Sequence, residues 1–248
     1  MAVATGEAPR PPVCPGKVRR RRWLLAAVVA LVLFTAIAVG GRFLWLPTYR
    51  PALQPGERYG VDVSAYQGRI DWRAVAADHI GFVYIKATEG ATYVDRAFAA
   101  NWAAAASTGL PHGAYHFFSF CSPGAAQAEN FLRTVPRDGT ELMPAVDLEL
   151  AGNCHRRPSR AAVDAQLTAF LSAVQAVTGR TVVIYLGADY ARRYPLPPSG
   201  RHPLWLRRVL RRPAAGSWLI WQVDANATVR GIHGAVDLDV MRAADGSG

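Results

Sequence analysis

Two acidic residues, Asp147 and Glu149, lie one residue apart at the end of a short apolar segment. Side chains along a β-strand alternate between its two faces, so both carboxyl groups share one face, while Val146, Leu148 and Leu150 share the other. Carboxylates this close cannot both ionise without cost, so one has a raised pKa and donates a proton while its neighbour stays charged. Acetal hydrolysis needs this division, because the leaving oxygen takes a proton and negative charge stabilises the oxocarbenium-like centre. The alternative interpretation is a pair of solvated acids at a surface strand end.

Segments rich in β-branched and aromatic residues alternate with helical patterns from residue 58 onward. They predict strands at Tyr59–Ser64, Gly81–Thr88, Leu110–Phe117, Leu142–Leu150, Thr181–Leu186, Pro203–Leu206, Trp218–Val223 and Ala235–Val240. The clearest helix between them begins near Ser159 and ends at Gly179. Alternating strands and helices indicate a parallel sheet with right-handed crossovers. About eight strands in roughly 190 residues favour an α/β fold closed as an irregular, TIM-like (β/α)-barrel.

Further acids are predicted to lie at one end of this barrel. Asp62 falls near the end of the first predicted strand, Glu89 just after the second, and Asp237 in the last. Catalytic groups of (β/α)-barrels collect at the carboxyl ends of the strands. We therefore predict that Asp62 and Asp237 lie at the mouth that holds Asp147 and Glu149, where several carboxyl groups surround one site.

Aromatic residues also occur in or beside the predicted strand ends: Tyr66, Tyr84, Tyr115, Phe117, Phe118, Tyr185, Trp205 and Trp221. Sugar rings stack on such side chains, although aromatic residues are equally ordinary components of a core. Lys86 lies in an apolar strand, where a salt bridge to an acid at the barrel mouth is a better interpretation than a Schiff-base lysine. His112 and His116 share one strand face and fit hydrogen-bonded structural histidines better than a metal pair.

The net charge of +10 is concentrated near the N-terminus. Residues 1–50 contain eight basic residues and one acid, a net +7, which leaves +3 for the remaining 198 residues. The basic residues flank an apolar segment and do not form a groove interleaved with aromatic residues, so nucleic-acid binding is disfavoured. A hydrophobic content of 51% with 19% charged residues excludes a disordered or fibrous chain.

The nineteen residues from Trp23 to Gly41 carry no charge and follow the basic stretch Lys17–Arg22. As a helix they reach about 28 Å, close to the ~30 Å hydrocarbon core of a bilayer. Basic residues before such a segment stay cytoplasmic. We predict a transmembrane anchor, with a cleaved signal peptide as the alternative because Ala36-Ile37-Ala38 matches a cleavage site. Both interpretations export everything after residue 50.

The chain is thus expected to contain a basic cytoplasmic segment (1–22), an anchor or signal peptide (23–46), a linker (47–57) and a barrel (58–243). Export leaves Cys121 and Cys154 together in an oxidising compartment, whereas Cys14 stays cytoplasmic or is removed. A disulfide between Cys121 and Cys154 is therefore a better expectation than two free thiols or a metal site, since no cysteine has zinc-type spacing.

Nine short motifs occur in collinear order over about residues 58–242: Tyr59–Gly68, Ile70–Trp72, Tyr84–Gly90, Gly113–Phe117, Asp147–Glu149, Ile184–Tyr185, Leu204–Leu206, Ile220–Gln222 and Gly231–Asp239. Together they resemble glycoside hydrolase family 25, the lysozymes of the Chalaropsis type. The resemblance implies the family's irregular barrel of eight strands and five helices. It also implies a muramidase, which hydrolyses the β-1,4 bond between N-acetylmuramic acid and N-acetylglucosamine in peptidoglycan, without a cofactor or metal.

The resemblance assigns a role to each acid. Glu149 matches the family's proton donor, and Asp147 matches the partner carboxylate, which assists the substrate's 2-acetamido group or acts as another base or stabiliser. Asp62 and Asp237 match two further active-site aspartates. We expect substrate contacts from Glu89, Tyr66, Tyr115, Tyr185, Trp205 and Trp221. Retention and inversion of the anomeric configuration both remain open.

Three features depart from the family pattern. Asp239 stands where the family usually has asparagine, which adds an acid close to the mouth. Residues Leu206–Val209 read Leu-Arg-Arg-Val instead of the usual Ile-Ala-x-Tyr, which puts one aromatic wall of the substrate groove in doubt. Cys121 and Cys154 follow neighbouring strands, and we predict that they join two loops beside Glu149.

The presence of all four acids favours an enzyme over the alternative of a non-catalytic peptidoglycan-binding barrel. A chitinase-like activity is disfavoured, because the longer D-x-x-D-x-D-x-E pattern is absent from the sequence. We expect a monomer whose partners are peptidoglycan glycan strands and, through the N-terminal helix, the membrane. The barrel is then extracytoplasmic, anchored in the periplasm or at the cell surface, or secreted if the N-terminal segment is cleaved.

Overall fold

A computed structural model of the chain describes residues 15–137, 142–196, 202–214, 216 and 218–243. The chain forms two compact units, of which one ends at Leu46 and the other begins at Pro47. Arg10 and Cys14, which belong to the expected cytoplasmic segment, lie outside the described residues.

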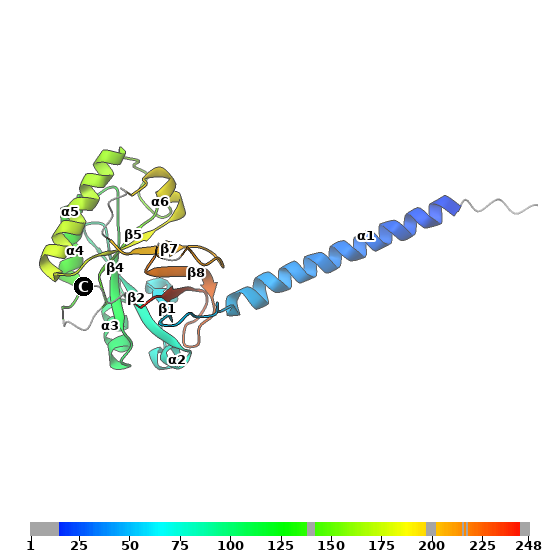
Figure 1. Ribbon diagram of the computed structural model, residues 1–248, viewed down its shortest axis with the longest axis horizontal. Coiled ribbons are helices and arrows are strands. Elements are labelled where there is room, and N and C mark those ends of the chain that lie inside the picture. Colours follow the sequence, from blue (N-terminus) through cyan, green and yellow to red (C-terminus); the bar gives the residue numbers. More distant parts are fainter. Residues whose placement is uncertain (1–14, 138–141, 197–201, 215, 217, 244–248) are drawn as a thin grey trace, which may run out of the picture. The chain divides into compact units, whose positions relative to one another are not determined.

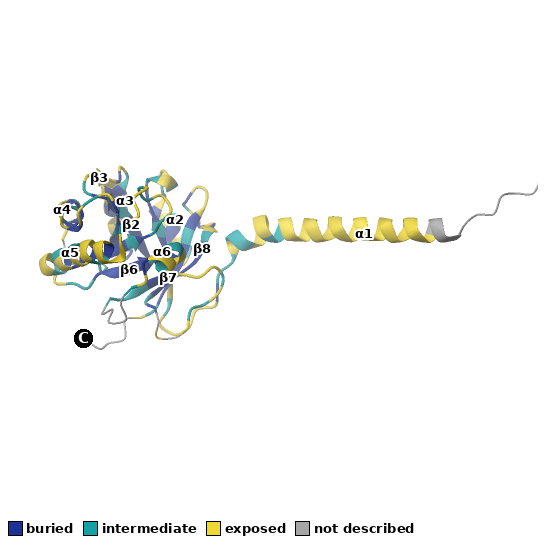
Figure 2. Ribbon diagram, turned by 90° about the horizontal axis from the view of Figure 1, so that it is seen from above, coloured by how far each residue is buried: buried dark blue, intermediate teal, exposed yellow. Residues whose placement is uncertain are grey.

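Helix α1, Pro15–Gly40, forms most of the first unit and continues into a π-helical turn at Gly41–Trp45. A helix that is apolar on every face cannot bury one stripe against a core and leave the other in water. The described side chains of α1 are largely exposed, such as Leu31 at 65% and Phe34 at 70% (Figure 2). By length and composition, the span Arg19–Thr48 can cross a membrane. This helix fits both expected roles, an anchor and a signal peptide.

The second unit is an α/β barrel (Figure 1). Its strands are β1 (Arg58–Val63), β2 (Ile80–Glu89), β3 (Tyr93–Val94), β4 (His112–Phe117), β5 (Ala145–Leu148), β6 (Val183–Leu186), β7 (Leu204–Arg207), β8 (Ile220–Ala227) and β9 (Val236–Met241). Within the described residues, eight strands pair in the order β1-β9-β8-β7-β6-β5-β4-β2, and β2 closes the ring by pairing with β1. The short β3 pairs only with the end of β2. The predicted barrel is thus confirmed.

Strand β9 departs from the expected parallel arrangement. It is antiparallel to both of its neighbours, β8 and β1, whereas the other barrel pairs are parallel. A parallel return requires a crossover of about a dozen residues or more. Only residues 228–235 separate β8 from β9, and they contain no helix. As a result, the amino end of β9 lies at the barrel mouth, where Asp237 pairs directly with Asp62.

Five helices accompany the barrel in the described part of the second unit: α2 (Trp72–Ala77), α3 (Phe98–Ser107), α4 (Gly124–Thr134), α5 (Arg160–Thr178) and α6 (Ala188–Arg193). Helix α5 shows how the sequence sets their ends. The Ser159 hydroxyl accepts a hydrogen bond from the Ala162 amide, which satisfies one of the unpaired amides of the first turn. Gly179 ends α5 in a left-handed conformation that favours glycine. Both predicted ends of this helix are confirmed.

Alternation along the strands creates two hydrophobic layers. The outer face of each strand packs against the helices. For example, the buried side chains of Val146 and Leu148 on β5 belong to the same cluster as Phe170 of α5. The opposite faces fill the barrel interior with a second cluster: Phe82, Tyr84, Ala145, Val183, Tyr185, Trp205, Ile220 and Met241. Gly60 is required here, because a Cβ at this position would lie 2.2 Å from the Phe82 ring. The inner cluster supports the side chains that follow it along the same strands.

Candidate active site

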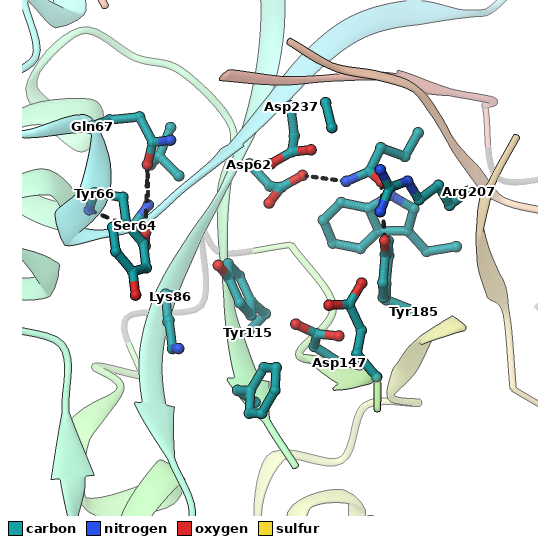
Figure 3. A pocket seen from close by; sticks show the side chains of 16 residues that line it. Asp62, Ser64, Tyr66, Gln67, Lys86, Tyr115, Asp147, Tyr185, Arg207 and Asp237 are labelled. Atoms are coloured by element: carbon teal, nitrogen blue, oxygen red, sulfur yellow. Dashed lines mark hydrogen bonds between the residues drawn. The ribbon is translucent and has the colours of Figure 1, made fainter. Parts of the chain in front are cut away.

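The barrel mouth holds a pocket of about 310 Å³. Its lining is polar and aromatic, and comes from all eight barrel strands and the turn after β1 (Figure 3). The lining residues are Asp62, Val63, Ser64, Tyr66, Gln67, Lys86, Tyr115, Phe117, Asp147, Glu149, Tyr185, Trp205, Arg207, Gln222, Ala225 and Asp237. The structure therefore brings together Asp62, Asp147, Glu149 and Asp237, the four acids that we singled out in the sequence.

Strand alternation places these acids. Asp147 lies two residues beyond Ala145 of the inner cluster, so its side chain shares the inner face of β5, while Val146 and Leu148 face outward. Glu149 follows directly after this strand. The buried apolar neighbours thus fix which side chains enter the pocket.

Asp62 and Asp237 form a cross-strand pair on β1 and β9. The Gln222 amide nitrogen donates to Asp62 Oδ2 at 3.2 Å, and the Tyr185 hydroxyl donates to Gln222 Oε1 at 3.0 Å. Figure 3 shows Asp62 and Asp237 next to each other, with Asp147 across the pocket. Asp62 therefore belongs to a hydrogen-bonded chain that runs through Gln222 to Tyr185.

Burial raises the pKa of Asp147 well above its ordinary value, and the charge of Glu149 raises it further. The cation of Lys86 opposes this rise. Asp147 Oδ1 is buried and has no hydrogen-bond partner among the described residues. A buried oxygen without a hydrogen bond destabilises the protein, so a donor group on a bound molecule would be stabilised by binding to it.

Burial also raises the pKa of Glu149, while the neighbouring Tyr185 hydroxyl and the charge of Arg207 oppose the rise. We expected one acid of the Asp147–Glu149 pair to be raised and the other to stay charged. In the structure both pKa values are raised, because burial dominates for both carboxyl groups. The pair on its own does not divide into an acid and a base.

Two further carboxyl groups are perturbed in the same direction. Burial raises the pKa of Asp237 to about 6, with Arg207 opposing the rise. Burial raises the pKa of Asp62 well above its ordinary value, and the charges of Asp237 and Asp239 add to this rise. Asp239 is fully buried and accepts a 2.8 Å hydrogen bond from the Trp205 indole. The mouth thus concentrates carboxyl groups that retain protons at higher pH than free carboxyl groups do.

Lys86 Nζ lies 2.8 Å from Glu89 Oε2, so the salt bridge expected for Lys86 is present. Lys86 lines the pocket, whereas Glu89 does not. The ammonium group also lies 4.8 Å from the centre of the Phe117 ring, which is within range of a cation–π contact. Glu89 therefore holds Lys86 from outside the pocket lining, and its charge also contributes to the raised pKa of Asp147.

The aromatic residues divide between the two faces of their strands. Tyr66, Tyr115, Tyr185 and Trp205 line the pocket, and Tyr66 is 93% exposed. Trp221 lies outside it, because Gln222, its neighbour on β8, occupies the inner face. The Trp221 indole is buried in the outer cluster and donates to the Arg208 carbonyl at 2.7 Å.

Some lining residues were not among our predicted site residues: Ser64, Gln67, Arg207 and Gln222. Arg207 and Gln222 occupy paired positions on β7 and β8. Each lies two positions from an inner-cluster residue, Trp205 and Ile220 respectively. The two-residue spacing is visible in the sequence. Which residues of β7 and β8 face inward, however, depends on the barrel register, and the sequence does not show it.

A disulfide and one asparagine hold the loops beside Glu149. Cys121 and Cys154 form a disulfide that joins the loops after β4 and β5. The Asn153 amide nitrogen donates to the Glu149 carbonyl at 3.0 Å and to the Phe118 carbonyl at 2.7 Å. The backbone at Glu149 is therefore tied to the neighbouring loop.

The histidines singled out in the sequence lie outside the pocket lining. His116 is buried between Thr88, at 2.7 Å from its Nδ1, and Gln127, at 3.0 Å from its Nε2. His112 Nδ1 lies 2.8 Å from the Leu110 carbonyl. In the described part of the chain, no group of three or more histidine, cysteine or acidic residues is arranged to hold a metal ion.

Comparison with known proteins identifies the fold and its chemistry. The model of the family "Glycosyl hydrolases family 25" matches residues 61–232. Lysozyme M1 of Streptomyces globisporus is 34% identical over 192 residues, which cover 72% of this chain and 65% of that protein.

Solved structures agree with this match. A family 25 glycosyl hydrolase from Bacillus anthracis has a TM-score of 0.72 and 33% identity, covering 79% of this chain and 94% of that one. A bacterial lysozyme from Streptomyces coelicolor has a TM-score of 0.66 and 30% identity, covering 77% and 95%. With the acid-lined mouth of its barrel, the chain belongs to glycosyl hydrolase family 25 and is a glycoside hydrolase.

Proposed function

We propose that this glycoside hydrolase is a muramidase, which cleaves the β-1,4 bond between N-acetylmuramic acid and N-acetylglucosamine in peptidoglycan. The observation that carries the proposal is the meeting of Asp62, Asp147, Glu149 and Asp237 in one aromatic-walled pocket. Relatives named "Lysozyme M1" and "N,O-diacetylmuramidase" support it.

Glu149 is the proton donor in this proposal. Its raised pKa favours the protonated form, and it lies on the pocket surface where a glycosidic oxygen can reach it. As the bond breaks, the proton moves from Glu149 to the leaving oxygen, and the sugar left behind gains oxocarbenium-like charge. The surrounding carboxylates stabilise that charge. Water then supplies the hydroxyl group at the anomeric carbon, and its other proton returns to the carboxyl groups of the site.

Asp147 is the partner carboxylate. Its unpartnered Oδ1 is an acceptor for the N–H of the substrate's 2-acetamido group. A hydrogen bond donated to the charged form lowers the pKa of a carboxyl group. Substrate binding therefore favours ionised Asp147 and leaves the proton on Glu149, which provides the division of roles that the empty pair lacks.

The remaining pocket residues hold the substrate. Asp62 is fixed by the Gln222 amide, and it pairs with Asp237 across the strands. Tyr66 offers an exposed ring at the rim, while Tyr115 and Tyr185 offer walls further in. In this proposal the carboxylates accept hydrogen bonds from hydroxyl groups of the sugar, and the aromatic rings cover its faces.

The N-terminal helix gives the enzyme its location in this proposal. Arg19 to Arg22 precede an apolar span long enough to cross a bilayer, so the basic end stays cytoplasmic. Residues 47–57 then link the span to a barrel that works as a monomer on the outer side of the membrane, where peptidoglycan lies. Retention of Ala36–Ala38 in the mature protein, read by N-terminal sequencing, distinguishes an anchor from a cleaved signal peptide.

The test incubates the full-length chain, purified in detergent, with peptidoglycan and identifies the released reducing ends. We expect N-acetylmuramic acid at those ends. Glu149→Gln should reduce the rate at least a hundredfold, in the range found when a positioned acid is removed. Glu129→Gln, on the exposed face of α4, is the matched control and should keep full activity. Equal rates for Glu149→Gln and the control, or N-acetylglucosamine at the new ends, would contradict the proposal.

A further inference from the structure

Arg207 is a cation of the pocket that the proposed mechanism does not use. It ends β7 two residues after Trp205, so both side chains face the barrel mouth, while Leu204 and Leu206 pack on the outer cluster. It is paired with Gln222 of β8, and Figure 3 shows it at the pocket. Arg207 therefore enters the site through strand geometry.

None of the described residues binds the Arg207 guanidinium directly. In the part of the chain that the structure describes, it has no hydrogen bond and no ion pair, although it lies close enough to Glu149 and Asp237 to lower the pKa of both. Lys86, the other cation in the lining, is held by Glu89 at 2.8 Å. Arg207 is also exposed, so its five N–H donors are open to a bound molecule.

The substrate supplies a matching anion. Muramic acid carries a lactyl ether that ends in a carboxyl group, attached directly to the sugar ring. Where the stem peptide is present, this carboxyl group is a neutral amide, and where the peptide has been removed, it is a carboxylate. The acids of the mouth repel a carboxylate, whereas a planar guanidinium binds it with two parallel hydrogen bonds.

We propose that Arg207 forms a carboxylate-binding subsite that makes the enzyme prefer glycan strands with free lactyl groups. The proposal rests on the muramidase function. Carboxylates of a stem peptide lie beyond the first amino acid and so further from the ring, whereas Arg207 lies beside the proposed proton donor Glu149. Its substrate would be supplied by hydrolysis of the amide between the lactyl group and the peptide. The family's usual alanine at this position has no charge to offer.

The neighbouring Arg208 provides a matched control. Its side chain is exposed, it does not line the pocket, and its backbone carbonyl accepts the Trp221 indole hydrogen. Arg207→Ala and Arg208→Ala remove the same charge from adjacent positions. Only Arg207→Ala removes the charge from the pocket. A loss of general electrostatic attraction should therefore lower the activity of both variants, whereas the loss of a subsite should lower the activity of Arg207→Ala alone.

The experiment gives the full-length chain three substrates: peptide-free strands with lactyl carboxylates, the same strands converted to neutral methylamides, and peptide-bearing peptidoglycan. We expect the unmodified protein and Arg208→Ala to favour carboxylate strands over methylamide strands about tenfold in kcat/KM, mainly through KM. Arg207→Ala should show no such preference, and Arg207→Lys should retain part of it. Thermal unfolding of each variant checks that the barrel is folded.

A preference that survives in Arg207→Ala, or is absent from the unmodified protein, would overturn the subsite. So would a loss in Arg207→Ala that is confined to peptide-bearing peptidoglycan, because it would assign Arg207 to stem-peptide carboxylates. A change in the pKa of Glu149 alone alters the rates on all three substrates together and leaves their ratio intact. Failure of every protein to release reducing ends from any substrate would overturn the muramidase proposal, and this inference with it.

Discussion

Replacement of Asp239 by asparagine should change how the stability of the barrel depends on pH. Asp239 is fully buried, and one of its oxygens accepts from the Trp205 indole while the other has no partner among the described residues. Burial, with the nearby charge of Asp237, raises the pKa of Asp239 well above its ordinary value. Asparagine has the same shape, keeps an oxygen for Trp205 and presents an N–H group toward Asp62.

The sign and size follow from proton linkage. Above the pKa of the unfolded chain, the folded barrel holds a proton on Asp239 that the unfolded chain has lost. Unfolding then releases a proton, so the free energy of unfolding falls as pH rises, by about 1.4 kcal/mol per pH unit, until the folded pKa is reached. The asparagine side chain of the variant has no proton to release. The variant should therefore gain about 1.4 kcal/mol per pH unit over the original protein within that interval.

Urea unfolding, followed by tryptophan fluorescence at pH 5, 6 and 7, measures this difference. The stability curves of the two proteins should diverge steadily with pH, with Asp239→Asn the more stable at pH 7. Asp164→Asn, which removes a carboxyl group from the exposed face of α5, is the control and should run parallel to the original protein. Parallel curves for Asp239→Asn as well would falsify the claim that folded Asp239 is a neutral acid.

Three more substitutions test other parts of the site. Lys86→Met should shift the pH–activity profile to higher pH, because the Lys86 charge lowers the pKa of Asp147; an unchanged profile would refute this coupling. Cys121→Ser, which removes the disulfide to Cys154, should cost about 2–4 kcal/mol of stability in urea unfolding, and a loss well below 1 kcal/mol would refute the estimate from loop closure. Asn153→Ala leaves two backbone carbonyls without their donor and should cost about 1–3 kcal/mol, again measured by urea unfolding.

The sequence predicted the strands because their apolar and β-branched runs are short and punctuated. It also predicted the face of β5 that carries Asp147, since alternation alone determines it. Parallel pairing, inferred from the alternating strands and helices, does not extend to β9, because the eight residues 228–235 are too few for a parallel return. The length of that connection was available in the sequence, and it outweighs the parallel rule inferred from the earlier strands.

Trp221 illustrates what the sequence could not determine. A tryptophan near a strand end is equally suited to a sugar-binding wall and to a core, and its type does not say which. The choice depends on the register of β8, in which Gln222 takes the inner face and bonds to Asp62. One residue of register exchanges the two faces. The register of β8 is set by pairing with β7 and β9, so it is a property of the closed barrel.

The pKa values in the pocket also depend on the closed barrel, and not only on which acids are present. Asp147 and Glu149 are separated by a single residue, and their mutual repulsion was foreseeable. Burial, however, is a property of the whole barrel, and it raises the pKa of both carboxyl groups together. The asymmetry that catalysis requires must then come from what each acid contacts. Tyr185 and Arg207 lower the pKa of Glu149, so they do not by themselves make it the acid. In the proposed mechanism the division comes from the substrate, whose N–H group binds the empty acceptor of Asp147 and favours its ionised form.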